Sequence, residues 1–139
     1  MFASVNGVRL FFDVVGEKLH IDGAALKERP TLICLHGGPG GDHQSLRPDF
    51  DRFAQRAQVL YVDQRGGGRS GHGSPELWTL DQWADDVAGL CGALGVEKPI
   101  VIGVSGGAMV ALSYLERYPG EARGAILVNA CEIACARAS

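Results

Sequence analysis

Ser105 is the residue whose surroundings point most directly to chemistry. It stands in the pattern G-x-S-x-G, which runs from Gly103 to Gly107 between an apolar run and a helical pattern. A strand that passes at once into a helix makes a sharp turn, and such a turn exposes the serine hydroxyl. The glycines leave room where a Cβ would collide with neighbouring backbone, and the positive end of the helix favours a developing anion. The pattern therefore predicts that Ser105 is the nucleophile of an acyl-transfer reaction.

A glycine-rich loop is placed to supply hydrogen-bond donors to the same reaction. The sequence HGGPG at residues 36–40 directly follows the apolar run TLICL. Glycine lets backbone approach a substrate closely, and we expect the N–H groups of Gly38 and Gly106 to form an oxyanion hole. His36 would lie at the foot of this loop without reach to Ser105, so we expect it to be structural. The alternative is a plain turn rich in glycine and proline.

A second glycine-rich segment, DQRGGGRSG at residues 63–71, follows the apolar run QVLYV. It contains a literal G-x-G-x-x-G, the fingerprint of dinucleotide-binding folds. That fingerprint must open a helix directly, with an acidic residue at the end of the next strand. Here the loop HGSPELW follows, and Asp85 and Asp86 fall within a helical pattern. The sequence therefore predicts no dinucleotide, and we expect no other cofactor or metal.

All three segments follow short apolar runs that alternate with helical patterns. Runs that are apolar at every position are typical of strands buried on both faces, so the alternation predicts an α/β fold with a mostly parallel sheet between helices. Ligands bind at the carboxyl ends of such strands, where the three segments lie. The expected strands are 8–15, 31–35, 58–62, 99–104 and 124–129. One helix is expected at 48–57, a second from a capping box at Thr79 and Gln82 to Gly95, and a third directly after Ser105. We also expect a turn at Asn6-Gly7 and a loop at 18–29.

The composition is that of one soluble domain. The chain has 139 residues, of which 46% are hydrophobic and 21% charged, and its net charge is −3. This acidic balance argues against a nucleic-acid-binding surface, which would gather Lys and Arg. No apolar run approaches the roughly 20 residues that span a bilayer, and the N-terminus lacks the features of a signal peptide, so we expect a cytoplasmic protein without a membrane partner. The scattered Cys34, Cys91, Cys131 and Cys135 suit a reducing compartment, and no second ligand pair accompanies the last two for zinc.

Taken together, HGGPG, DQRGxGxS and G-x-S-x-G resemble, at these intervals, the proline iminopeptidase branch of the α/β-hydrolases. The resemblance covers nearly all of the chain. It implies an aminopeptidase that removes N-terminal proline, or a relative that acts on other amides or esters. It assigns the nucleophile to Ser105 and the oxyanion donors to Gly38 and Gly106, and it implies structural roles for Asp63 and Arg65. The residue after the serine, usually Trp in that branch, is Gly106 here.

The acid and base of the expected triad do not follow Ser105 in this sequence. In the superfamily an Asp or Glu and then a His come after the nucleophile, and here no Asp and no His does. We therefore expect residues 1–139 to be a single partial α/β-hydrolase domain, truncated before the cap and the last strands. Loss of the triad histidine costs on the order of a millionfold in kcat, so we expect the isolated chain to be nearly inert. The strand at 124–129 would become an exposed edge, open to self-association or to a complementing chain.

His43 is the upstream alternative for the base. A triad histidine needs an orienting carboxylate, and none is evident for it in the sequence. A solvent-facing loop histidine is therefore the expectation for His43.

Three functions remain open at this point. The first is a proline iminopeptidase-like serine hydrolase that acts on a small-molecule or peptide substrate. The second is an esterase, a lactonase or a cofactor-free haloperoxidase, because the same serine machinery serves them all. The third is a non-catalytic chain that binds a partner through its edge strand.

Overall fold

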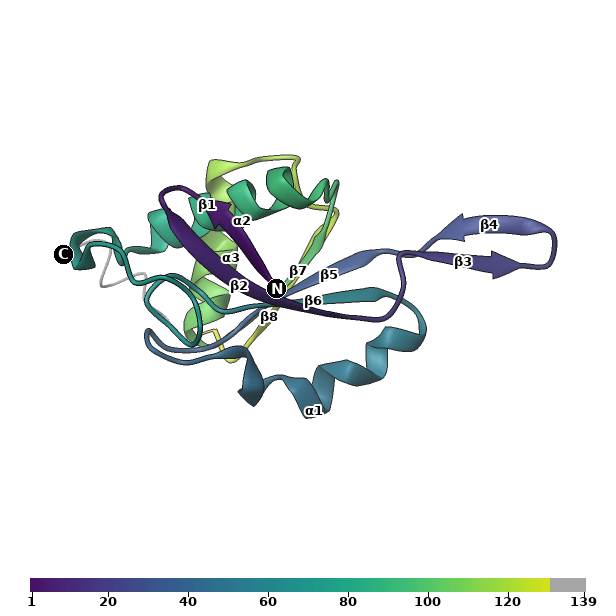
Figure 1. The fold of residues 1–139 in the computed structure, drawn as a ribbon, viewed down its shortest axis with the longest axis horizontal. Coiled ribbons are helices and arrows are strands. Elements are labelled where there is room, and N and C mark those ends of the chain that lie inside the picture. Colours follow the sequence, from purple (N-terminus) through teal and green to yellow (C-terminus); the bar gives the residue numbers. More distant parts are fainter. Residues whose placement is uncertain (131–139) are drawn as a thin grey trace.

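A six-stranded sheet between helices forms the body of the protein (Figure 1). The computed structural model describes residues 1–130. The strands of this sheet are β1 (Phe2–Val5), β2 (Val8–Val15), β5 (Thr31–Leu35), β6 (Gln58–Val62), β7 (Ile100–Val104) and β8 (Gly124–Val128). Their order is β1-β2-β6-β5-β7-β8; the last four run parallel, and β1 and β2 are antiparallel. The predicted mostly parallel α/β fold is confirmed.

Helices cover both faces of this sheet. The α-helices are α1 (Arg47–Phe50), α2 (Leu80–Leu94) and α3 (Gly106–Arg117), and the 3-10 turns are η1 (His43–Ser45), η2 (Asp51–Gln55) and η3 (Pro75–Leu77). Helices α2 and α3 lie on one face, and α1 lies on the other (Figure 1). The two faces hold separate apolar cores. Strand β5 is buried at every position, as its uninterrupted run TLICL predicts.

Helix α2 begins and ends at the residues that its capping signals predict. The Oγ1 of Thr79 accepts the backbone N–H of Gln82 at 3.1 Å, and Gly95 closes the helix in the left-handed conformation with φ 67°. The capping box is not reciprocal, because the Gln82 side chain donates to Asp86 Oδ1 at 3.0 Å. The apolar stripe of the helix packs into the larger core.

Residues 18–29 are not the loop that we expected from their polarity. They form a hairpin of β3 (Leu19–Asp22) and β4 (Ala25–Glu28), which projects from the body of the protein (Figure 1). Leucine and isoleucine alternate with polar residues in β3, a strand pattern that the many charges of this segment conceal.

The helix expected at 48–57 is also different. It is divided into α1 and η2, and only part of its apolar face is covered. Phe50 and Ala57 pack into the smaller core, whereas Phe53 remains exposed.

Cys34 and Cys91 are buried free cysteines. Burial raises the pKa of the Cys34 thiol to about 12 and that of Cys91 to about 11, so both are protonated core thiols near neutral pH. Cys131 and Cys135 lie outside the described residues. Within residues 1–130, no helix combines the length and the apolar character needed to cross a membrane.

Arg65 ties the loop after β6 to α2. Its guanidinium donates to both carboxylate oxygens of Asp86, with Nε–Oδ2 at 2.8 Å and Nη2–Oδ1 at 2.9 Å, and to the carbonyl of Asn6 at 2.9 Å. Both side chains of the ion pair are buried, and the hydrogen bonds to Asp86 raise the pKa of Arg65 further. Trp83 Nε1 donates to the Arg65 carbonyl at 2.9 Å. These contacts give Arg65 the structural role that the resemblance implies.

Asp86→Ala should destabilise the fold strongly, because it leaves a buried guanidinium without its counter-charge. We expect a loss of about 3–5 kcal/mol in the free energy of unfolding, measured by urea titration with circular dichroism. The matched control is Asp85→Ala on the same helix, where the ion pair with Arg117 is more exposed. That change should cost about 1 kcal/mol or less. Equal losses for the two variants would contradict this account of the buried pair.

Candidate active site

Ser105 lies at the sharp turn between β7 and α3, with its side chain exposed. Its backbone has φ 54° and ψ −116°, a combination that residues other than glycine rarely adopt. Such strain persists only where the surroundings over-determine it, and it is typical of functional sites. The Ser105 N–H donates to the Val128 carbonyl at 2.8 Å, and the Ser105 carbonyl accepts the Ala108 N–H at 2.9 Å. Both sides of the turn are therefore fixed.

The glycine-rich loop at residues 36–40 packs directly on this turn. A Cβ placed on Gly37 would lie 3.4 Å from the Ser105 Cβ and 3.9 Å from its Oγ. A Cβ on Gly106 would lie 2.0 Å from the Gly38 carbonyl oxygen and 3.1 Å from the Gly38 nitrogen. Gly38 itself has φ 118°, which other residues avoid. The structure thus brings together Ser105, Gly38 and Gly106, the three predicted site residues.

The other glycines of the G-x-S-x-G pattern are fixed by further backbone contacts. A Cβ on Gly107 would lie 2.2 Å from the Leu35 carbonyl oxygen, and one on Gly103 would lie 2.3 Å from the Gly107 carbonyl oxygen. Real Cβ atoms do not approach backbone this closely. The glycines of the G-x-S-x-G pattern are therefore needed because α3 packs so closely against β7 and the end of β5.

His36 is a buried structural residue, as expected. Its Nε2 accepts the backbone N–H of Gln64 at 3.0 Å, so its Nδ1 carries the proton and donates to the Gly37 carbonyl at 2.7 Å. Gln64 Nε2 donates in turn to the His36 carbonyl at 2.8 Å. Burial lowers the pKa of His36, which keeps the ring neutral and able to accept. The imidazole therefore connects the 36–40 loop to the 63–71 segment.

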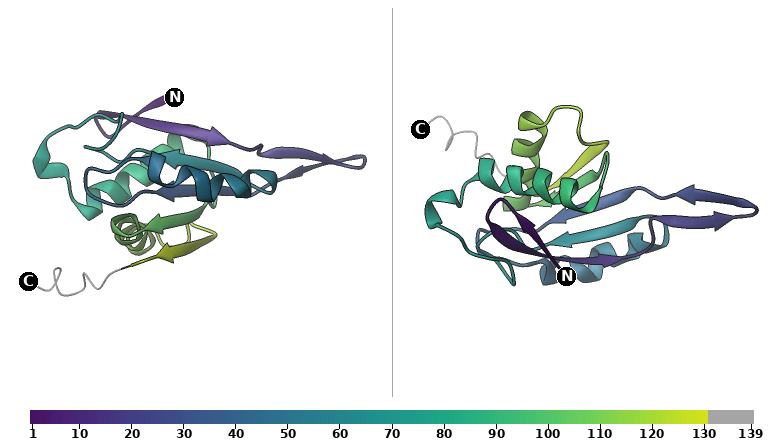
Figure 2. Two further views of the ribbon diagram at one scale, coloured as in Figure 1. Left: turned by 90° about the horizontal axis from the view of Figure 1, so that it is seen from below. Right: turned by 45° about the horizontal axis from the view of Figure 1, so that its top comes forward.

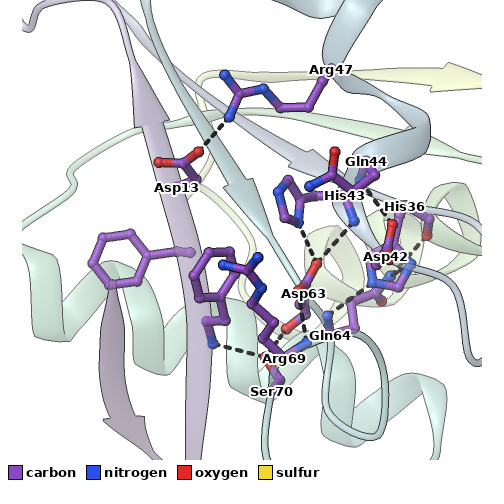
Figure 3. Close-up of polar contacts among 12 residues, drawn as sticks. Asp13, His36, Asp42, His43, Gln44, Arg47, Asp63, Gln64, Arg69 and Ser70 are labelled. Atoms are coloured by element: carbon purple, nitrogen blue, oxygen red, sulfur yellow. Dashed lines mark hydrogen bonds and ion pairs between the residues drawn. The ribbon is translucent and has the colours of Figure 1, made fainter.

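His43 and Asp63 form a buried pair beside this connection (Figure 3). One carboxylate oxygen of Asp63 accepts both the His43 backbone N–H at 2.9 Å and the His43 Nδ1 at 2.7 Å. The other oxygen accepts the Arg69 backbone N–H at 3.0 Å. His43 is only 4% exposed, with its ring near those of Phe11 and Tyr61. The expectation of a solvent-facing loop histidine is wrong.

This pair was missed because its partners lie far apart in the sequence. Asp63 directly follows β6, and His43 follows the loop after β5. Neighbouring parallel strands place the loops that follow them side by side. The pairing of His43 with Asp63 could therefore be predicted only if β5 and β6 were known to be neighbours in the sheet. The orienting carboxylate that His43 lacked in the sequence is present, but the ring is enclosed and has no hydrogen bond to Ser105.

The literal G-x-G-x-x-G does not open a helix. Gly66 donates its N–H to the Gly71 carbonyl at 3.1 Å, closing a turn, and only the short η3 lies between Gly71 and α2. The geometry of a dinucleotide fingerprint is absent from this segment, as its sequence context predicts.

A cavity of about 10 Å³ lies between the two glycine-rich segments and α3. Gly38, Gln64, Trp83 and Gly106 are among its lining residues. This volume holds about one water molecule, far less than a substrate.

The match to a family model for the alpha/beta hydrolase fold covers residues 30–137. The chain belongs to the α/β-hydrolase family. Proline iminopeptidases of Lactobacillus helveticus and Clostridium botulinum are 30% and 35% identical to it over 88% and 81% of this chain. The crystal structure of a proline iminopeptidase-related protein from Thermus thermophilus matches 91% of the chain at 38% identity, with a TM-score of 0.78. An enol-lactonase from Burkholderia xenovorans shares the fold at 24% identity and a TM-score of 0.75.

The chain spans only 36–42% of the length of the two iminopeptidases and the Thermus protein. Within the described part of this α/β-hydrolase chain, Ser105 Oγ has no hydrogen-bond partner. Both ring nitrogens of His36, and the Nδ1 of His43, are engaged in the contacts given above.

Gly106→Ala should displace the 36–40 loop of this α/β-hydrolase, because the new Cβ would meet the Gly38 carbonyl. We expect a loss of about 1–3 kcal/mol in the free energy of unfolding, with NMR amide shifts concentrated in residues 36–40. The matched control is Gly92→Ala on α2, where a Cβ meets nothing within 4 Å. The control should stabilise the helix by about 0.5–1 kcal/mol. A Gly106→Ala protein as stable as the native one would contradict the close contact.

Proposed function

We propose that this chain carries the nucleophile and the oxyanion-hole donors of a serine hydrolase of the proline iminopeptidase type. The observation that carries the proposal is the strained, exposed Ser105 at the turn into α3, with the Gly38 peptide packed on the next residue. Strain at an exposed serine is costly to the fold, and a nucleophile elbow explains it. The positive end of α3 lies at the same turn and favours negative charge there.

In this proposal Ser105 Oγ attacks the carbonyl carbon of an amide or ester while its proton passes to a histidine base. The carbonyl π bond opens, and the resulting oxyanion is held by the N–H groups of Gly38 and Gly106. The intermediate collapses, and the leaving amine or alcohol takes the proton from the imidazolium. Water then hydrolyses the acyl-enzyme by the same steps.

N-terminal proline peptides are the favoured substrates. This choice rests on relatives named proline iminopeptidase, which match most of the chain at about 30–35% identity. An esterase, lactonase or haloperoxidase-like hydrolase is the alternative, since the enol-lactonase shares the fold. The small cavity beside Gly106 gives no selection between these substrates.

The proposal also includes the partial nature of the domain. We take residues 1–139 as one part of an α/β-hydrolase domain whose acid and base are supplied elsewhere, because relatives that match it are more than twice as long. The isolated chain would then be nearly inactive. A cytoplasmic location suits the two buried, protonated thiols, Cys34 and Cys91.

A second candidate function rests on strand β8. This strand pairs only with β7 among the described residues, and its Ile126 is 52% exposed. An apolar edge strand is a template for another strand, from a complementing chain or from a second copy. In this role the chain would bind a partner without performing chemistry.

Kinetics with and without the rest of the coding sequence test the proposal. We expect the 139-residue chain to show no Ser105-dependent hydrolysis of proline p-nitroanilide, because a serine without its base loses on the order of a millionfold in kcat. The protein translated from the gene past Ser139 should hydrolyse it, and Ser105→Ala should abolish that activity. The ratio of anilide to p-nitrophenyl ester turnover then selects the substrate class.

A fluorophosphonate probe provides an independent readout of the nucleophile. Labelling of the isolated chain that disappears in Ser105→Ala would overturn the prediction that this chain is inert. An active longer protein that keeps its activity in Ser105→Ala would overturn the assignment of the nucleophile. Ser113→Ala is a control, since this buried α3 serine donates to Asp81 at 2.8 Å and should not react.

A further inference from the structure

The β3–β4 hairpin presents an apolar face that nothing in the described chain covers. It extends away from the body in all three ribbon views (Figures 1 and 2). Leu19, Ile21 and Leu26 share one face and are 46%, 78% and 67% exposed, and Glu28 lies on the same face opposite Leu19. The opposite face carries an ion pair, Lys27 Nζ to Asp22 Oδ2 at 2.5 Å. A two-stranded hairpin alone is only marginally stable, and three or more strands are normally needed.

The outer edge of β3 also has open backbone groups. The Arg29 N–H donates to the Lys18 carbonyl at 2.6 Å, which makes these two a hydrogen-bonded pair at the base of the hairpin. Antiparallel pairs alternate, so the pair of His20 and Lys27 is hydrogen-bonded and the pair of Leu19 and Glu28 is not. The N–H and C=O groups of Leu19 and Ile21 therefore point away from β4. They form a short row of donors and acceptors ready for another strand.

We propose that this edge is the contact between two copies of the chain. Strand β3 pairs with β3 of the second copy in antiparallel orientation, about a two-fold axis at His20. This register places Leu19 opposite Ile21 of the other copy, so their open backbone groups are satisfied on both sides. It also places Lys18 opposite Asp22 of the other copy, twice by symmetry. The contact is self-complementary, as a two-fold interface requires.

The neighbouring registers are less favourable. A shift in one direction places Ile21 opposite itself and Leu19 opposite Gly23, and it loses both ion pairs. A shift in the other direction places Ile21 opposite Glu17 and Lys18 opposite His20. A shift by one residue would bring the apolar face of one copy beside the polar face of the other. Only the register centred on His20 gives two apolar pairs and two opposite-charge pairs together.

The edge of β4 is less suited to self-pairing. If β4 paired with β4 of a second copy and Leu26 lay opposite Leu26, Lys27 would lie opposite Ala25. In the next register, Lys27 would lie opposite Lys27 of the other copy. Charged residues on an edge strand discourage such pairing. The choice of β3 therefore follows from the residues of the two strands.

Pairing through β3 would give a four-stranded sheet with three large apolar side chains from each copy on one face. Such a sheet meets the condition for independent stability that a single hairpin does not. The hairpin leads directly into the amino end of β5, whereas Ser105 follows the carboxyl end of the parallel strand β7. The contact would therefore leave both Ser105 sites open, and it does not depend on the proposed hydrolase function.

Sedimentation equilibrium with a charge exchange tests the register. One variant is Lys18→Asp, and the other is Asp22→Lys combined with Lys27→Asp, which keeps an ion pair within the hairpin. Each variant alone opposes like charges at both symmetric positions and should weaken dimerisation about tenfold or more. In an equimolar mixture, the aspartate introduced at position 18 faces the lysine introduced at position 22, and the native Asp22 of the first variant faces the native Lys18 of the second. Heterodimers should therefore form about as well as the native dimer.

Two control variants separate this contact from association through another surface. Arg56→Asp makes the same kind of charge change at an exposed position after η2 and should leave dimerisation unchanged. Ile126→Lys alters the β8 edge and should also leave it unchanged. A native protein that stays monomeric up to about 1 mM, the weak end of protein affinities, would overturn the proposal. So would a dimer insensitive to Lys18→Asp, a mixture that does not associate, or a dimer that is lost in Ile126→Lys.

Discussion

The close approach of two backbones governs the architecture around Ser105. The end of β5 and the loop after it lie against the first turn of α3 with no space for a side chain at Gly106 or Gly107. This contact fixes where α3 begins, and the start of α3 in turn forces Ser105 into its positive-φ conformation. The strain at Ser105 is thus balanced by the packing of the sheet and the helix on either side of the turn. At Gly106 the Gly38 carbonyl oxygen occupies the space that a Cβ would need.

A buried polar network holds the two glycine-rich segments together behind this contact. Neutral His36 joins its own loop to Gln64, and Asp63 joins the backbone and ring of His43 to the backbone of Arg69. Few apolar side chains are available in segments so rich in glycine, so hydrogen bonds provide their order. Because buried polar groups are costly when unpaired, each member constrains the others to one arrangement. The polar side chains of the two glycine-rich segments therefore have a structural role, because they hold both segments in one arrangement.

The sequence predicted the elements that are marked by an uninterrupted apolar run or by clear capping residues. The runs at 8–15, 31–35 and 58–62 match β2, β5 and β6 residue for residue, and the caps of α2 are where Thr79 and Gly95 place them. The hairpin at 19–28 was missed because its alternation is short and its surroundings are highly charged. The pairing of His43 with Asp63 was missed because it depends on the order of strands in the sheet. The predicted site residues meet because the loops that carry them follow the carboxyl ends of adjacent strands. A base for Ser105 was found neither in the sequence after it nor in the described part of the structure.

The most direct test of the central claim is a crystal structure of the catalytically active protein after reaction with a phosphonate inhibitor. The account predicts a covalent adduct on Ser105 Oγ, with the phosphonyl oxygen about 2.7–3.1 Å from both the Gly38 and the Gly106 nitrogens. An adduct whose oxygen points away from these two N–H groups, or an inhibited enzyme with unmodified Ser105, would contradict it.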